Sequence, residues 1–272
     1  MAAPRLQATV NCDMGEGYSL YTIGDDEQLM KTIHLANIAC GFHASDFSIM
    51  DKTVRLAKEN GVRVGAHPSL PDRQGFGRRE MAMEPDELTA CFVYQVGALC
   101  GFLTRYDVPL NHIKPHGSGL RDDGARHRTR ARRCVCREDV QSVLHGSGWN
   151  MPPTSLRRNG RAFHSRYRYE ASRRLAYSEL SAFTEWFADL DYDANGKLLI
   201  TKKHDPVPAD KVRERVTTVL ETKQVTTVAG LLPLPAGVQN LSICCHSDTP
   251  GAVEIARAVK SLVDVHNDTN PS

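Results

Sequence analysis

The chain has 272 residues, of which 41% are hydrophobic and 24% are charged, and its formal net charge is +2. This size and composition suit one large domain with a packed core and exclude a low-complexity or collagen-like chain. The small net charge gives no reason to expect a nucleic-acid or membrane partner. The sequence contains no run of 18 apolar residues that would predict a membrane span.

The cysteines and the N-terminal segment point to a reducing compartment. Eight cysteines are scattered without a C-x-x-C pair, so we read them as thiols and not as a disulfide framework. The segment MAAPRLQATVNCD has no apolar stretch after Arg5, which argues against a secretory signal. We therefore predict a cytoplasmic protein.

The first 117 residues alternate between short apolar runs and longer helical patterns. Gly61 would stop the first long helix, and Pro85 fits the first turn of the second. This alternation predicts an α/β fold with a parallel sheet and crossover helices. The expected strands are Leu6–Cys12, Ala36–Cys40, Val62–Ala66 and Leu110–Ile113, and the expected helices are Asp46–Asn60 and Pro85–Arg105.

The last 90 residues return to the same pattern. A helix is predicted over Pro208–Glu221, and strands over Val225–Ala229 and Leu241–Cys245. A final helix opens at Thr249 and Pro250 and runs to about Val263.

The middle of the chain breaks this pattern. Between Ser118 and Arg174 lie 14 of the 24 arginines and none of the 10 lysines, with no sustained helical or strand period. Three interpretations compete: a basic disordered insertion that binds an acidic partner, an unusual folded excursion, or translation of a wrong reading frame or unspliced intron. We favour the last, because a natural basic loop usually mixes lysine with arginine.

Polar side chains recur just after the predicted strands. In a parallel barrel the carboxyl ends of the strands share one face, where catalytic groups collect. We therefore expect residues far apart in the sequence to meet in one cavity. The residues concerned are Asn11, Asp13, Glu16, His43, Asp46, His67, Asp72, Lys114, His116, His246 and Asp248.

The roles of these residues stay open at this level. The four histidines, with Asp13 and Asp248, could bind a divalent metal or act as general acids and bases without one. Lys114 could hold an anion as a point charge, and Arg78 or Arg79 could clamp an acidic substrate. The sequence lacks G-x-x-x-x-G-K-[ST], so no P-loop would hold a nucleotide.

Several longer blocks resemble a known family. The segments VNCDMGEGY, NIACGFHASD, VGAHPSLPDRQGFGRR, YQVGALCGFL, HIKPHG and CCHSDTPGA are similar, in order, to signature blocks of the LamB/YcsF family. The resemblance covers residues 6–117 and 183–266. It implies a single β/α-barrel domain over residues 1–272, of the glycoside hydrolase/deacetylase type, interrupted by the Arg-rich segment 118–182.

The resemblance also implies an activity. It is that of a component of ATP-dependent 5-oxoprolinase, which opens the lactam 5-oxoproline to L-glutamate with separate B and C components. Motif by motif, and with Arg78 added from its position after GFG, we assign the site in two groups. The expected catalytic residues are Asp13, Glu16, His43, His67, Lys114 and His116, and the expected substrate-binding residues are Asn11, Asp46, Arg78, His246 and Asp248.

Two departures from the family pattern matter. The chain diverges directly after KPHG, at Ser118, and its last block reads His246-Ser247-Asp248 where the family usually has HGD. About 65 residues that should supply a crossover helix and one or two strands are unmatched. We therefore expect an irregular or incomplete barrel with open edges, and a poorly folded or inactive protein if the segment is genuine.

Two other functions remain compatible with these residues. The first is a metal-dependent carbohydrate deacetylase or hydrolase, which would need a bound divalent ion and no ATP. The second is a non-catalytic subunit of a multi-component complex, whose association would survive substitutions in the site.

Overall fold

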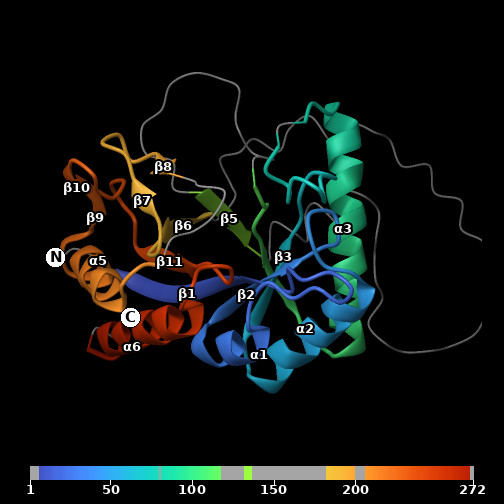
Figure 1. Cartoon of the computed structure of the whole chain (residues 1–272), viewed down its shortest axis with the longest axis horizontal. Coiled ribbons are helices and arrows are strands. Elements are labelled where there is room, and N and C mark those ends of the chain that lie inside the picture. The colour runs from blue at the N-terminus through green and yellow to red at the C-terminus, as the bar shows by residue number, and fades with distance from the viewer. Residues whose placement is uncertain (1–5, 80, 118–131, 137–181, 200–205, 270–272) are drawn as a thin grey trace, which may run out of the picture.

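The described strands close into a barrel. The structure is a computed structural model, and it describes residues 6–79, 81–117, 132–136, 182–199 and 206–269 (Figure 1). The strand order around the barrel is β1-β11-β6-β5-β4-β3-β2. These strands are β1 (Gln7–Met14), β2 (Leu35–Ala39), β3 (Arg63–His67), β4 (Leu110–Ile113), β5 (Arg132–Cys136), β6 (Ala182–Phe187) and β11 (Asn240–Cys245).

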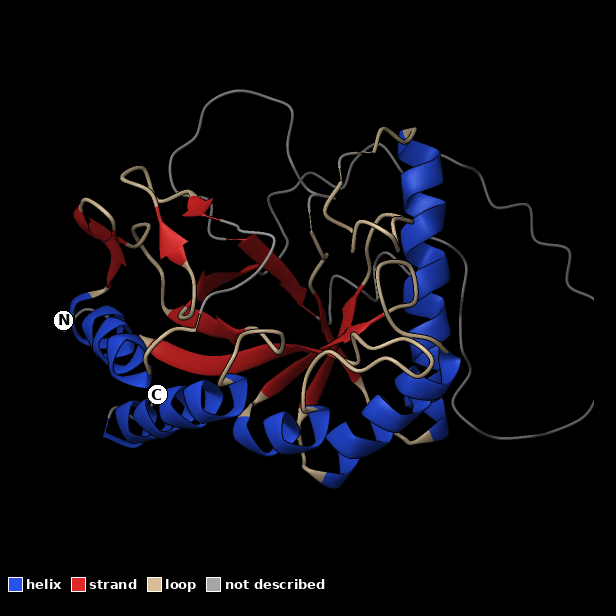
Figure 2. Cartoon of the chain, viewed as in Figure 1, coloured by secondary structure: helices blue, strands red, loops and turns tan. Residues whose placement is uncertain are grey.

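Helices cover the outside of the barrel along β1, β2 and β3 (Figure 2). Two small antiparallel pairs lie outside the barrel: β7 (Asp191–Tyr192) with β8 (Leu198–Leu199), and β9 (Gln224–Thr227) with β10 (Gly230–Pro233). The helices are α1 (Asp26–Leu29), the 3₁₀ turn η1 (Met30–Thr32), α2 (Phe47–Glu59), α3 (Pro85–Arg105), α5 (Ala209–Thr222) and α6 (Ala252–Thr269).

The parallel sheet is confirmed, but the expectation of open edges is wrong. Six barrel strands run in one direction, and β5 runs antiparallel between β4 and β6, pairing with both. A strand pairs through its backbone, so the Arg-rich segment supplies β5 despite its lack of apolar periodicity. The remainder of the anomalous segment predicted at 118–182, up to residue 181, lies outside the described residues.

The long predicted helices are confirmed, and their ends follow from local chemistry. The Asp46 carboxylate caps α2 by accepting hydrogen bonds from the backbone N–H groups of Ser48 and Ile49. Gly61, at φ +66°, ends that helix in the left-handed region that suits glycine. Pro85 occupies the first turn of α3, where a missing N–H costs nothing.

Two elements differ from prediction. The strand expected at Val225–Ala229 is β9, which forms a hairpin with β10 and takes no part in the barrel. A short apolar run predicts a strand but not its partner, and β9 buries only Val225, whereas the barrel strand β11 is buried along nearly its whole length. The last helix starts at Ala252 and continues to Thr269, beyond the expected end at Val263, and its added turns are held by His266 and Asn267, which contact the backbone of Leu6 and Ala8.

By length and composition one described helix, Asp86–Arg105 of α3, would be able to cross a membrane. This helix is a core helix. Its side chains Val96, Leu99 and Leu103 are buried and belong to the main hydrophobic cluster. Its apolar composition therefore reflects packing beside β3.

The barrel interior is polar where the outside of the strands is apolar. On β1, Val10 and Cys12 join the hydrophobic cluster, whereas Asn11 and Asp13 hydrogen-bond to residues of neighbouring strands. Successive side chains of a strand point to opposite faces, so this alternation follows from strand geometry. The carboxyl end of the interior is consequently lined by groups that can do chemistry.

Candidate active site

The carboxyl ends of the parallel strands bring the predicted residues together. Asp13 lies near the end of β1, His67 at the end of β3, and His246 directly after β11. Glycines allow the loops to approach one another. A Cβ on Gly117, at φ +66°, would clash with the carbonyl oxygen of Gly77, so only glycine lets the His116 loop meet the 76–78 loop.

Four of the predicted catalytic residues form one buried cluster, which we call the histidine cluster: Glu16, His43, His67 and His116. Their ligand atoms all lie within 4.8 Å of one another. His43 Nε2 is 3.0 Å from Glu16 Oε1, and His67 Nε2 is 2.9 Å from His116 Nδ1. The rings of His43 and His116 stack with centroids 3.8 Å apart. This group could hold a metal ion.

The other two predicted catalytic residues form a buried ion pair beside that cluster. Lys114 Nζ lies 2.6 Å from Asp13 Oδ1 and 3.0 Å from Glu185 Oε1. The second Asp13 oxygen, Oδ2, is 3.2 Å from His67 Nε2. Asp13 therefore joins the lysine to the histidine cluster.

The carboxyl groups of Asp13 and Glu16 titrate in different ranges. Burial raises the pKa of Glu16 to about 7, and the negative charge of Asp13 adds to the rise. Burial also acts to raise the pKa of Asp13, but His67 and Lys114 outweigh it and hold that pKa well below its usual range. At neutral pH Asp13 is thus ionised, while Glu16 exchanges its proton readily.

Burial also keeps two residues of the histidine cluster, His43 and His116, neutral. It lowers the pKa of both His43 and His116 well below the ordinary value. Neutral imidazole carries a free nitrogen lone pair, which is the form that binds metals and accepts protons.

His246 lies near Asp13 but forms a separate pair with Asp189. The Asp189 carboxylate accepts from Thr249 Oγ1 at 2.9 Å and from the backbone N–H of His246 at 2.9 Å, and its Oδ1 lies 3.0 Å from His246 Nδ1. Burial alone would lower the pKa of His246, but this carboxylate raises it above the ordinary value.

Replacing Asp189 with asparagine should therefore reverse the shift of His246. We expect the pKa of His246, followed by NMR of the ring protons, to fall below its ordinary value of about 6.5, since burial then acts unopposed. In the wild type the pair of His246 and Asp189 stabilises the fold fully below about pH 6.5, the pKa of an unfolded histidine. This contribution is lost as the pH rises through the higher pKa that His246 has in the folded protein. Asp264→Asn, on the surface beside His34, should leave His246 unchanged; an unaltered titration in Asp189→Asn would contradict the assignment.

The remaining predicted residues line the edge of the site or support it. Arg78 and Asp248 face each other at 3.7 Å and are partly exposed. Asn11 lies in the barrel interior, where it donates to Ser242 Oγ at 2.7 Å. The carboxylate of Asp46 accepts from the helix cap and from the backbone N–H of Ser19, and Asp72 is held by Arg79, so neither joins the histidine cluster.

Sequence reasoning missed four buried polar residues of the site: Asn37, His112, Glu185 and Asp189. Asn37 donates to Asn11 Oδ1 at 2.7 Å and to Asp13 Oδ1 at 2.8 Å, and its own oxygen lies 2.6 Å from His112 Nε2. For Asn37, His112 and Glu185 the available signal was a polar residue inside an apolar strand, and for Asp189 it was a carboxylate just after the end of β6.

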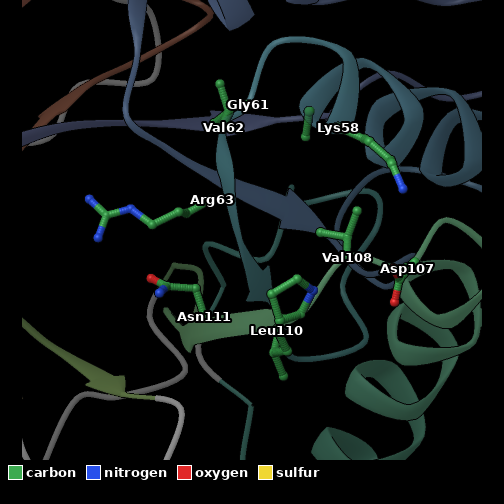
Figure 3. A pocket seen from close by; sticks show the side chains of 10 residues that line it. Lys58, Gly61, Val62, Arg63, Asp107, Val108, Leu110 and Asn111 are labelled. Atoms are coloured by element: carbon green, nitrogen blue, oxygen red, sulfur yellow. The ribbon is translucent and has the colours of Figure 1, made fainter.

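A small cavity lies at the other end of the strands. Its volume is about 290 Å³, and it is lined by residues at the starts of β3 and β4, including Arg63, Leu110 and Asn111, with Lys58 and Asp107 beside them (Figure 3). None of the predicted site residues lines it. In barrels of this type the amino-terminal end of the strands serves stability, so we do not place the active site there.

A closed α/β barrel with acids, imidazoles and a buried lysine at the carboxyl ends of its parallel strands defines an enzyme of the β/α-barrel class. Comparison with known proteins narrows this class. The model of the LamB/YcsF family matches residues 8–146 and 162–270, and the chain belongs to that family. The match continues past residue 117 and resumes before residue 183.

Named relatives align along nearly the whole chain. The chain is 42% identical to lactam utilization protein lamB of Emericella nidulans, over 98% of both chains. It is 36% identical to the 5-oxoprolinase A subunit of Staphylococcus carnosus, over 94% of both. The crystal structure of a lactam utilization protein from Thermus thermophilus superposes with a TM-score of 0.68 at 30% identity, covering 96% of this chain and 97% of that one.

Proposed function

We propose that this chain is the A component of an ATP-dependent 5-oxoprolinase, which opens the lactam 5-oxoproline to L-glutamate. The observation that carries the proposal is the alignment, over nearly the full length of the chain and at 36–37% identity, with proteins named as the 5-oxoprolinase A subunit. The buried acid and histidine groups at the strand ends support it. The word subunit in those names supports partner components, which we take to be B and C. The barrel is then of the glycoside hydrolase/deacetylase type.

The chemistry required is the activation of an inert amide. A lactam resists water because its C–N bond has partial double-bond character. ATP, when bound, would supply a phosphoryl group to the lactam oxygen and so make the ring carbon electrophilic. Water could then add to that carbon, the C–N bond would break with a proton passing to nitrogen, and a second water would release phosphate and L-glutamate. The chain's own residues must then bind the substrate, move protons and stabilise the charge that develops on oxygen.

Asp13 fits the role of general base. It is buried and ionised, and His67 and Lys114 fix both of its oxygens. Lys114 is committed to Asp13 and Glu185, so we assign it to positioning Asp13 and not to binding a substrate anion. A pKa of about 7 suits Glu16 for passing a proton near neutral pH.

Substrate recognition falls to the partly exposed side of the site. Arg78 offers a planar cation to the substrate carboxylate, beside Asp248. The His246 side chain, whose pKa Asp189 raises, adds a second donor beside Asp13. The buried free cysteines of the described residues agree with a reducing, cytoplasmic location.

The direct test is a reconstituted assay. The full chain, mixed with its B and C components, should release L-glutamate from 5-oxoproline only when ATP is present, with matching release of ADP. Omitting this chain should abolish glutamate formation. Hydrolysis of an acetylated sugar by this chain alone, without ATP, would instead support the deacetylase alternative, and full activity of B and C without this chain would refute the proposal.

A further inference from the structure

We propose that Glu16, His43, His67 and His116 bind one divalent cation that accepts nitrogen ligands readily, such as Zn²⁺, Co²⁺ or Ni²⁺. Three imidazoles and one carboxylate suit such ions and are poor ligands for Mg²⁺, which takes oxygen ligands and accompanies nucleotides. The ion is thus distinct from any magnesium that ATP brings. The inference rests on the proposed function only in placing the ion beside the reacting amide.

The spacing of the ligand atoms is that of a coordination shell. With metal–ligand bonds of about 2.1 Å, neighbouring ligands stand about 3.0 Å apart in octahedral geometry and about 3.4 Å apart in tetrahedral geometry. The structure gives 3.0 Å for His43 Nε2 to Glu16 Oε1, 3.5 Å for His116 Nδ1 to Glu16 Oε1 and 2.9 Å for His67 Nε2 to His116 Nδ1. His67 Nε2 and Glu16 Oε1 are 4.0 Å apart, near the separation of about 4.2 Å between opposite ligands of an octahedron. The four residues come from four separate loops or strand ends, so the fold itself makes them converge.

The outer nitrogens of two rings are already committed. His67 Nδ1 contacts the backbone oxygen of Lys114, and His116 Nε2 lies 2.8 Å from the backbone oxygen of Phe76. A carbonyl oxygen only accepts, so each ring must carry its proton on that side. The inner nitrogens, His67 Nε2 and His116 Nδ1, lie 2.9 Å apart and both face the histidine cluster, where they can bind one cation. Backbone partners of this kind orient histidine ligands in metal sites.

The third ring is held toward the same point. His43 is 1% exposed, and its Nδ1 finds no hydrogen-bond partner among the described residues. The contacts that fix the ring are the stack on His116 and the approach of Nε2 to Glu16. Both direct Nε2 into the histidine cluster.

The site also gathers acidic groups around few cations. Asp189 pairs with His246, while Asp13 and Glu185 share the Lys114 ammonium, and Glu16 has no lysine or arginine within salt-bridge distance among the described residues. Uncompensated buried charge is costly, and a divalent ion would offset the excess.

Only one ion fits among the described residues of the site. A second group of possible ligands, Asp13, Cys244 and His246, also lies within 4.8 Å. Lys114 Nζ already occupies that position, 2.6 Å from Asp13 Oδ1 and 3.2 Å from Cys244 Sγ. The lysine thus takes the place that a second cation would have in a two-metal site.

The test measures bound metal on the purified full chain, without ATP or partner components. After incubation with Zn²⁺, Co²⁺ or Ni²⁺ and gel filtration, elemental analysis should find about one ion per chain, and a roughly tenfold excess of Mg²⁺ should not displace it. The cobalt form should show visible d–d absorption. His116→Ala and His43→Ala should lose the ion and the absorption. His266→Ala, whose ring lies outside the cluster at 2.9 Å from the backbone oxygen of Leu6, should keep both.

A folded wild-type chain that retains no ion, checked by its thermal melt, would overturn the proposal. Binding that survives both cluster substitutions would overturn the ligand assignment as well. The function and the metal site fail separately: bound metal without ATP-dependent glutamate release contradicts only the function, and glutamate release by a metal-free chain contradicts only the ion.

Discussion

Replacing Lys114 with methionine should abolish glutamate release and lower the free energy of unfolding by about 3–5 kcal/mol, because it leaves buried carboxylates without their cation. Lys114 is 2% exposed, and both Asp13 and Glu185 contact its ammonium group. Methionine keeps much of the length and volume of the lysine side chain, so the loss of unfolding free energy reports the missing charge and not a cavity. Urea unfolding followed by circular dichroism gives the stability, and the reconstituted assay gives the activity.

A double substitution separates these two effects. Adding Glu185→Gln to Lys114→Met removes one uncompensated charge and should recover part of the lost stability. It should not restore turnover, since Asp13 still lacks the lysine that positions it. Recovery of both stability and turnover would mean that Lys114 acts only through the fold, and no stability loss in the single variant would mean that the ion pair is not formed.

The positions of the predicted site residues could be read from the sequence because they follow apolar strands. His67 ends β3, and Lys114 directly follows β4, so the rule that parallel strands share one active end was enough to group them. Their distances could not be predicted, because these depend on the register of strands that are distant in sequence. The pairing of Cys12 with Cys245, for example, joins the first strand to the last.

The buried polar residues that the sequence did not reveal show a second limit of prediction from sequence. Glu185 stands beside Trp186 and Phe187 and reads as a surface residue of an edge strand, yet β6 lies between β5 and β11 and turns it inward. Asn37 and His112 read as breaks in apolar strands, but they form a hydrogen-bonded chain to Asp13. A buried polar residue is stabilised by partners that only the folded barrel supplies.

The antiparallel strand β5 illustrates the same point for the fold. Its sequence, RRCVC, offers no long apolar run, and backbone pairing with β4 and β6 is what gives it a place. Local pattern identifies the strands that carry their own hydrophobic signal. Closure of the barrel is a global property, because it removes the exposed edges of two neighbouring strands at once.

Asp13→Asn should reduce the rate of 5-oxoproline opening by about 10²- to 10⁴-fold, the usual contribution of a general base. Asparagine has nearly the same shape and still offers an oxygen to Lys114, so substrate binding should change much less than turnover. The assay compares kcat and KM with those of Asp51→Asn, a matched change at a partly exposed carboxylate that pairs with Arg105. Wild-type turnover in Asp13→Asn would assign the base to another group.

The same variant should alter the acid stability of the protein in a defined direction. His67 and Lys114 outweigh the effect of burial and hold the pKa of Asp13 below its unfolded value of about 3.9. Its contribution to stability is therefore complete above about pH 3.9 and is lost as the pH falls through the folded pKa. Asp13→Asn has no carboxyl to protonate, so its unfolding free energy should fall less than that of the wild type between about pH 4 and pH 2. Parallel curves for the two proteins over that range would show that the Asp13 carboxylate is not held by Lys114 and His67.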